Sequence, residues 1–330
     1  RLPRFTKVLL ELSVLFLCLA GLFVFAVFAG IFGHLQTVDE LKAYRNATAS
    51  VVLSENGRTI GKFFYENRTN ISAGEIPEHL SEALIATEDI RFSEHKGIDT
   101  RSLFRVFFKS VLMRDRSSGG GSTITQQLAK NMFRRKSFGP LTLPVNKTRE
   151  IILAIRLEKA FPKDEILTLY LNTVSFGENV YGIEAAAKVY FGTTTQTLTI
   201  AQAALLAGVI KSPTHYAPHL HLDKSVERRN LVLSLMADQG FITAEQETQA
   251  RAEEVVLVPE TETKYDYFTD MVLCEAEDLL NMDTETLLAS GYRIYTTLDQ
   301  ELQNEVEALF ENNNGFPENA VDGEQCQAAL

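Results

Sequence analysis

Cysteine is scarce in this chain, and most of the short signatures that identify enzymes are missing. The three cysteines in 330 residues, Cys18, Cys274 and Cys326, form neither a CxxC pair nor a disulfide framework. A P-loop, an HExxH zinc helix, a GxSxG nucleophile turn and the DxD pair of many nucleotide-sugar transferases are all absent. The sequence therefore predicts no nucleotide cofactor and argues against these enzyme classes.

Positive charge is also in deficit. The formal net charge is −11, which argues against nucleic acid as the main partner. Hydrophobic residues make up 45% of the chain and charged residues 23%, a balance typical of a folded protein and not of a disordered one. A chain of this length can hold one large domain with smaller accessory parts.

One hydrophobic run is long enough to cross a membrane. Residues 12–32 carry no charge and, as a helix rising about 1.5 Å per residue, can span a bilayer core of about 30 Å. We expect a transmembrane anchor over residues 8–32. Arg1, Arg4 and Lys7 precede it, so the positive-inside rule predicts a cytoplasmic N-terminus at residues 1–7 and an extracytoplasmic remainder. A cleaved signal peptide is the alternative, but its apolar region would be shorter.

A cluster of polar residues follows an apolar stretch with helical spacing that begins at Leu80. Glu88 lies near the end of this helix. If the helical turn continues, Glu88, Phe92 and His95 share one face, with Asp89 beside them. An aromatic neighbour and a second acid both raise the pKa of a carboxylate, as a general base requires. A solvated polar helix end is the alternative.

A glycine loop at residues 119–121 precedes a second polar helix. Ser122 and Thr123 can cap that helix, and Thr123, Gln127, Lys130 and Asn131 recur at helical spacing. A polar face of this kind is costly to bury without a ligand. The pattern therefore favours a binding site.

Together these residues resemble the peptidoglycan glycosyltransferases, glycosyltransferase family 51, which include the transglycosylase part of class A penicillin-binding proteins. The resemblance extends over about residues 51–240. Three ordered motifs carry it: Glu88-Asp89-x-x-Phe92-x-x-His95-x-Gly97-x-Asp99, then Ser122-Thr123-x-Thr125-Gln126-Gln127-Leu128-x-Lys130-Asn131, then the run from Glu158-Lys159 through Lys163-x-Glu165 to Tyr170-Leu171-Asn172.

The resemblance implies a mostly α, lysozyme-like domain behind a single transmembrane helix. We expect the glycosyltransferase domain over residues 33–250, with a membrane-facing small lobe at about 102–140. The apolar and basic stretch 102–114 suits a membrane surface, although an ordinary core helix is the alternative. Residues 251–330 should form a linker with short α/β structure and the start of a truncated transpeptidase region.

The sequence also predicts individual elements. An Asn-Gly turn predicts a hairpin within residues 50–62, and apolar periodicity predicts helices over 148–161, 163–172, 184–190 and 201–207. Thr199 and Gln202 form a capping box for the last of these. Further on, residues 253–264 have the composition of a linker, and a helix over 265–280 and a strand over 292–298 follow.

By the same resemblance, the enzyme polymerises lipid II by inverting transfer from a lipid-diphosphate-linked chain to the 4-hydroxyl of an acceptor sugar. Glu88 is then the general base, and Glu150 assists on the diphosphate side, where it could hold a divalent metal such as Mg²⁺ or Mn²⁺. The remaining residues expected to bind substrate or to orient Glu88 are Asp89, Phe92, His95, Thr123, Gln127, Lys130, Asn131, Lys147 and Arg149.

Two local features qualify this assignment. Lys147 and Glu150 should open the helix at 148–161, where the helix dipole favours anions, although an ordinary first-turn charge pair is the alternative. The family usually has arginine before the lysine that matches Lys147, whereas this chain has Asn146. One phosphate contact is therefore in doubt.

Two other classes of function stay open. A lytic muramidase would need a protonated acid but neither the basic diphosphate site nor the anchor. An inactive membrane scaffold would not need Glu88, Lys130 and Glu150 together. For the enzyme, the expected partners are lipid II, the lipid-linked glycan chain, the bilayer of the bacterial plasma membrane and other cell-wall synthesis proteins.

Overall fold

The computed structural model describes residues 4–43, 50–63, 71–102, 104, 121–133, 135–178, 180–259, 266–282, 287 and 292–311. The chain divides into two compact units. The first comprises Arg1–Asn46 and Asn67–Glu260, and the second comprises Ala47–Glu66 and Thr261–Leu330. The predicted domain over residues 33–250 is thus interrupted, because residues 47–66 belong to the second unit. The predicted membrane-facing stretch 102–114 lies outside the described residues except for Ser102 and Phe104.

The first unit begins with the long apolar helix α1 (Arg4–Phe28). Large side chains such as Phe16 and Leu17 are exposed along it, and its Glu11–Phe28 part is long and apolar enough to cross a membrane. The short helix α2 (Val38–Lys42) follows, with a capping box between Thr37 and Glu40. The predicted N-terminal apolar helix is therefore present.

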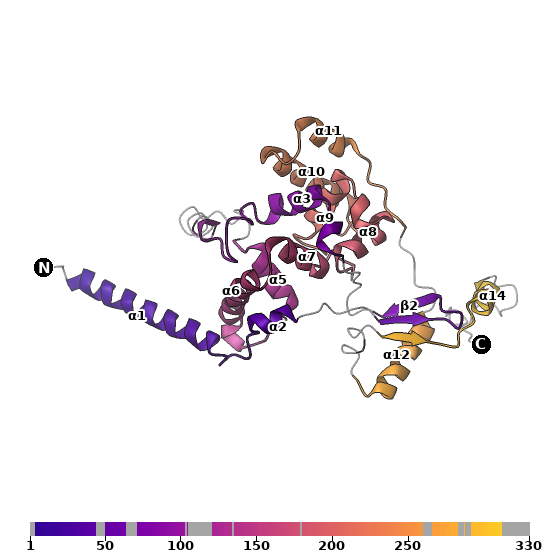
Figure 1. Ribbon diagram of the computed structural model, residues 1–330, viewed down its shortest axis with the longest axis horizontal. Coiled ribbons are helices and arrows are strands. Elements are labelled where there is room, and N and C mark those ends of the chain that lie inside the picture. Colours follow the sequence, from indigo (N-terminus) through magenta and orange to yellow (C-terminus); the bar gives the residue numbers. More distant parts are fainter. Residues whose placement is uncertain are drawn as a thin grey trace, which may run out of the picture. The chain divides into compact units, whose positions relative to one another are not determined.

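The main core of the first unit lies among α3 (Glu78–Glu88), α5 (Ile124–Met132), α6 (Thr142–Ala160) and α7 (Lys163–Thr173), which Figure 1 shows close together. Each helix buries an apolar stripe: Leu84 of α3, Leu128 of α5, Leu153 of α6 and Tyr170 of α7 are inaccessible or nearly so. This packing fixes the C-terminal end of α3 relative to α5.

In the described part of this unit, further helices are α8 (Ile183–Phe191), α9 (Ile200–Val209), α10 (Leu222–Asp238) and α11 (Ala244–Ala252). Three short 3₁₀ helices, η1 (Ala73–Glu75), η2 (Gly139–Leu141) and η3 (Thr195–Thr197), connect longer elements. The predicted capping box of α9 is confirmed, since Gln202 N–H donates to Thr199 Oγ1. Small residues such as Ala83 and Ala204 form the contact of α3 with α9. The mostly helical fold is confirmed.

The acidic stretch after α11 is partly built into the first unit. Val255 and Leu257 pack against its core, and Val258 N–H donates to the carbonyl of Tyr190. Arg229, which is buried, donates to the carbonyls of Arg251 and Glu253. The prediction of a linker from composition is therefore wrong for residues 253–258, because backbone contacts and alternate apolar side chains anchor them.

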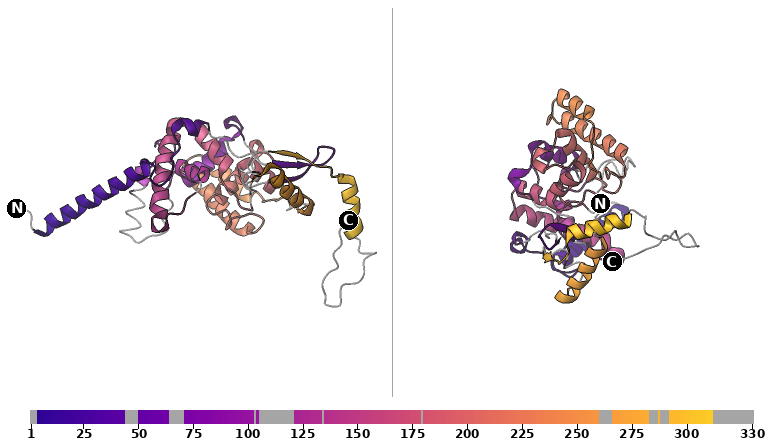
Figure 2. Two further views of the ribbon diagram at one scale, coloured as in Figure 1. Left: turned by 90° about the horizontal axis from the view of Figure 1, so that it is seen from below. Right: turned by 90° about the vertical axis from the view of Figure 1, so that its right-hand side faces the viewer.

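The second unit is a small α/β body. Strands β1 (Ser50–Leu53) and β2 (Thr59–Phe63) form the predicted antiparallel hairpin, and β3 (Arg293–Tyr295) pairs in parallel with β1. The order is β2-β1-β3. Helix α12 (Asp266–Leu280) packs its Val272 against this sheet, and α14 (Gln300–Glu311) follows β3 (Figures 1 and 2). The predicted helix and strand of this region are confirmed.

One helix start differs from the prediction. Helix α6 begins at Thr142, six residues before the predicted start at Thr148. Pro144 lies in its first turn, where a missing N–H costs no hydrogen bond. Lys147 and Glu150 therefore lie beyond the first turn, and the prediction that they open the helix is wrong. The helix dipole, which acts mainly within the first turn, contributes little at their positions.

Candidate active site

A pocket of about 740 Å³ in the first unit brings most of the predicted site residues together. Its walls come from the ends of α3 and α5, from α6 and α10, and from the loops between them. The described residues that line it include Glu88, Asp89, Asp99, Ser122, Thr123, Gln126, Gln127, Lys130, Arg135, Lys147, Glu150, Lys211 and Arg228. Acidic and basic side chains therefore share one cavity.

Glu88 is the last residue of α3. The helical turn does not continue, because Asp89 has the non-helical backbone angles φ −159° and ψ 73°. Glu88 Oε2 accepts a hydrogen bond of 2.8 Å from Gln127 Nε2. Its Oε1 is buried and has no hydrogen-bond partner among the described residues. One oxygen is thus held in place while the other keeps its lone pairs available for a ligand in the pocket.

A buried tyrosine fixes the orientation of this pair. The Tyr170 hydroxyl donates to Gln127 Oε1 over 3.0 Å, which directs the amide N–H₂ toward Glu88. Burial, together with the charge of Glu88, raises the pKa of Tyr170 well above its ordinary value, so the hydroxyl keeps its proton. The sequence reasoning missed this role because Tyr170 reads as part of an apolar stripe. The signal that could have revealed this role is the tyrosine hydroxyl, because a buried tyrosine hydroxyl usually needs a hydrogen-bond partner.

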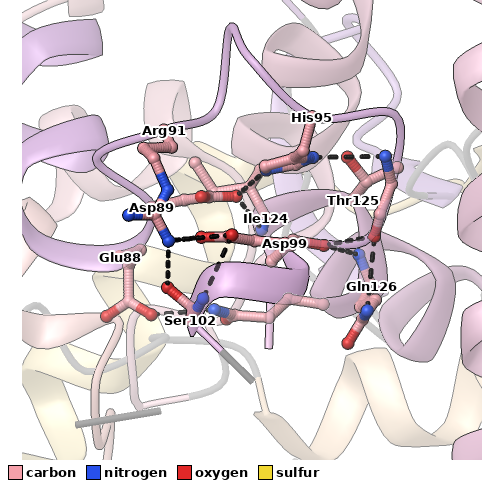
Figure 3. A network of polar contacts seen from close by, with 12 residues as sticks. Glu88, Asp89, Arg91, His95, Asp99, Ser102, Ile124, Thr125 and Gln126 are labelled. Carbon is pink, nitrogen blue, oxygen red and sulfur yellow. Dashed lines mark hydrogen bonds and ion pairs between the residues drawn. The ribbon is translucent and has the colours of Figure 1, made fainter. Parts of the chain in front are cut away.

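Asp89 and His95 form a buried clasp behind Glu88 (Figure 3). His95 Nδ1 accepts from Gly97 N–H, so its Nε2 donates to Asp89 Oδ2 over 2.8 Å. The same Asp89 oxygen accepts the N–H of Ile124, the first residue of α5. A carboxylate at a helix N-terminus is favourable. The clasp therefore ties the loop after Glu88 to the start of α5.

Phe92 packs against His95 outside the pocket. Its buried ring lies edge-on to His95, and Lys163 Nζ lies 4.3 Å from the centre of the ring. Lys163 also donates to the carbonyl of His95 and pairs with Glu158. Phe92 and His95 do not line the cavity among the described residues. The structure thus places them where they support the Glu88 loop.

A second ion pair stabilises the same loop. Asp99 pairs with Arg91 and accepts hydrogen bonds from both Arg91 and Ser102 N–H (Figure 3). Burial acts to raise the pKa of Asp99, but the hydrogen bonds from Ser102 and the pair with Arg91 outweigh it and lower the pKa to about 2. Asp99 is therefore ionised at neutral pH.

The predicted polar face on α5 is only partly present. Thr123 is the N-cap residue: its Oγ1 accepts from Gln126 N–H and donates to the carbonyl of Gly97. Gln127 and Lys130 line the pocket, whereas Asn131 is not among the described lining residues. Thr123 therefore has a structural role at the pocket wall, and Gln127 and Lys130 remain the α5 side chains best placed to meet a ligand.

Cations gather around Glu150 on the opposite helix. Glu150 is buried, and its two oxygens pair with Arg135 at 2.7 Å and with Lys147 at 3.2 Å. Lys147 Nζ also donates to Ser122 and Gln126 at the start of α5. Sequence reasoning missed Arg135 as a site residue, because it reads as one of several surface cations between Phe133 and Phe138.

The surroundings of Glu150 do not fit the predicted divalent metal. Both of its oxygens already pair with cations, and like charges would repel a metal ion. In the part of the chain that the structure describes, no group of three or more histidine, cysteine, aspartate or glutamate side chains could hold a metal. The arrangement instead fits Glu150 as the residue that orients two cations.

Two neighbouring α6 residues have structural partners. Asn146, which stands where the resembling family usually has arginine, is buried, and its amide bonds both backbone groups of Lys136 and the carbonyl of Thr142. Arg149 donates to the carbonyls of Phe32, Gly33 and His34 and is not among the described lining residues. Burial lowers the pKa of Arg149 from its ordinary value. This placement does not support a phosphate contact for Arg149.

The chain is similar to known proteins in sequence and in fold. The family model described as transglycosylase matches residues 56–237, more than half of the chain. Penicillin-binding protein 1F of Bacillus subtilis is 37% identical over 95% of this chain and 43% of its own length, and penicillin-binding protein 1A of Escherichia coli is 37% identical over 94% and 36%. The crystal structure of penicillin-binding protein 1A from Haemophilus influenzae aligns with a TM-score of 0.51 and 25% identity, covering 87% of this chain and 33% of that one.

Proposed function

The chain belongs to the transglycosylase family, and from this we propose that it is a peptidoglycan glycosyltransferase that polymerises lipid II into glycan strands. The observation that best supports the proposal is Glu88 Oε1, a buried carboxylate oxygen without a described partner, in the same cavity as Lys130, Lys147 and Arg135. A base and a group of cations in one pocket suit a reaction in which a hydroxyl attacks and a diphosphate leaves.

In the proposed reaction, Glu88 Oε1 takes the proton of the acceptor 4-hydroxyl as its oxygen bonds to the anomeric carbon of the donor. The bond from that carbon to the diphosphate breaks at the same time, and the stereochemistry inverts. Negative charge then develops on the leaving diphosphate, where Lys130, Lys147 and Arg135 stabilise it. Glu150 holds Lys147 and Arg135 in place.

The other site residues act through their neighbours. Gln127 holds Glu88 Oε2 and is itself oriented by Tyr170, while the Asp89–His95 clasp fixes the loop that follows Glu88. These contacts support an orienting role for Gln127, Asp89 and His95. They leave the other Glu88 oxygen open to the acceptor.

Helix α1 and the relatives support a proposal about location and partners. We propose that α1 anchors the chain in the bacterial plasma membrane, with the N-terminus in the cytoplasm and the pocket outside, where lipid-linked substrates present their sugars. The chain spans 43% and 36% of the lengths of the two relatives named above. A transpeptidase region and other cell-wall synthesis proteins as partners therefore remain proposals for the whole protein.

Incubation of the purified chain with lipid II in vesicles tests the function. We expect lipid-linked glycan polymer, measured by gel separation of labelled products. A second reaction with polymerised peptidoglycan and no lipid II separates the alternatives. Cutting of that polymer without any synthesis would replace the proposal with a muramidase, and inactivity in both reactions would favour a scaffold.

A further inference from the structure

Residues 29–37, which connect α1 to α2 and are called the exit segment here, are built into the unit that carries the pocket. Val27 near the end of α1, Leu35 in the exit segment and Leu41 of α2 are all buried in the main core of the first unit. The Phe32 ring lies edge-on to Phe138 at 5.6 Å. The proposed anchor therefore does not continue into a loose tether but joins the domain directly at this point.

Two arginines of α6 hold this exit segment by its backbone. Arg149 donates to the carbonyls of residues 32, 33 and 34 at 3.0–3.2 Å. Arg156 donates to the carbonyls of residues 35 and 36 at 2.9 and 2.6 Å, and its guanidinium lies 5.5 Å from the centre of the Phe28 ring. Five consecutive carbonyls, residues 32–36, thus accept from one helix.

The same helix carries the proposed diphosphate site on another face. At about 100° per residue, Lys147 lies about 160° to 180° around the α6 axis from both arginines. Its Nζ reaches Ser122 and Gln126 at the pocket, whereas Arg149 and Arg156 reach the exit segment. One rigid helix therefore connects the end of the proposed anchor with the cations of the pocket.

We infer that Arg149 and Arg156 are positioning residues that fix α6, and with it Lys147 and Glu150, at a set height above the bilayer. The inference rests on the proposed function. A lipid-linked diphosphate lies at the membrane surface. Cations that are held at a fixed distance from the anchor therefore already lie at the height of the diphosphate. A substrate that is free in solution needs no such fixed height, because it can diffuse into the pocket from any direction.

The test compares two substrates with the full chain reconstituted in phospholipid vesicles. One is lipid II in the same bilayer, and the other is a short-chain, water-soluble lipid II analogue that keeps the diphosphate. We expect Arg149→Ala combined with Arg156→Ala to reduce kcat/KM for bilayer lipid II by about tenfold or more, since small misplacements can cost about a hundredfold. The kcat/KM for the soluble analogue should change by less than about twofold, which corresponds to a fraction of a kcal/mol in activation free energy.

Matched variants make the result specific. Lys159→Ala removes an exposed cation from the same helix and should change neither rate. Arg149→Lys should behave like Arg149→Ala, because a lysine cannot spread its donors over three carbonyls as a guanidinium does. If the double variant fails to fold, as judged by its circular dichroism and thermal midpoint, Arg156→Ala alone provides the same comparison with Arg149 intact.

The rates on the two substrates decide whether the inference holds. Loss on the bilayer substrate alone supports the inference. Equal loss on both substrates overturns it, because both carry a diphosphate and the arginines would then act at the pocket or through general stability; unchanged rates on both also overturn it. If the unsubstituted chain turns over neither substrate, the proposed function itself has failed.

Discussion

At the scale of single residues, the central feature is how Glu88 is held. Its environment comes from three separate parts of the sequence: Gln127 on α5, Tyr170 on α7, and the Asp89–His95 clasp in the following loop. Helical spacing placed Glu88 at a helix end, but it could not show which of its oxygens would be engaged. That depends on the packing of α3, α5 and α7, which no local pattern specifies.

Tyr170→Phe tests the hydrogen-bond chain behind Glu88. Removing the hydroxyl leaves Gln127 Oε1 without its donor, and the amide can then turn away from Glu88. An unsatisfied buried acceptor costs about 1–3 kcal/mol. We expect kcat for polymerisation to fall by about threefold to tenfold with little change in KM, since the variant misplaces the base and not the binding groups.

The control for this variant is the partner residue. Gln127→Ala should reduce kcat at least as much, and the double variant should be no worse than Gln127→Ala alone, because the tyrosine acts only through the amide. Additive losses in this double-mutant cycle would show that Tyr170 contributes by general core packing instead.

Arg135 and Arg149 show where residue-level prediction fails. Both are arginines near the predicted diphosphate site, yet Arg135 lies in the pocket against Glu150 and Arg149 faces the exit segment of α1. A family motif gives an order of residues along the chain. It does not give the direction in which each side chain points.

At the scale of secondary structure elements, the periodic helices were predictable and their junctions were not. Helices α7, α9 and α12 begin and end within a few residues of their predicted bounds, because apolar residues recur at helical spacing in each of them, and a capping box also marks the start of α9. Helix α6 was predicted too short, since it begins at Thr142 and not at Thr148. The parallel pairing of β1 with β3 joins strands about 240 residues apart and has no local signal.

Gly97→Ala tests the packing of the loop after α3 on α6. Gly97 has φ +92°, and a Cβ there would lie 2.9 Å from both the carbonyl carbon and the oxygen of Ala154. Backbone strain costs about 1–3 kcal/mol, and the contact with helix backbone adds to it. We expect a free energy of unfolding lowered by about 3 kcal/mol or more, together with loss of activity.

The matched control is Gly240→Ala in the same unit. Gly240 also has a positive φ, +76°, but a Cβ there would meet no atom within 4 Å. It should cost only the strain of the backbone angle. Thermal unfolding of both variants separates the two contributions, and equal losses would mean that the close approach of Gly97 to α6 is unimportant.

At the scale of the whole molecule, the sequence predicted a mostly helical chain with an apolar N-terminal helix, and the structure confirms both. It did not predict that residues 47–66 leave the first unit to join residues 261–330, because the hairpin completes its sheet with a strand from the far end of the chain. The first unit alone contains the pocket and the elements that build it.

The central claim is that Glu88 is the general base of a lipid II polymerase. Its most direct test is the polymerisation rate of Glu88→Gln in lipid II vesicles, beside Glu94→Gln as a control. Glu94 belongs to the same loop but is exposed and pairs only loosely with Arg101, at 3.8 Å. A glutamine keeps the size of the side chain but cannot take the hydroxyl proton.

The account predicts that Glu88→Gln folds normally and polymerises at least about a hundredfold more slowly than the unsubstituted chain, while Glu94→Gln retains its rate. Polymerisation by Glu88→Gln at close to the unsubstituted rate would contradict the assignment of Glu88 as the base.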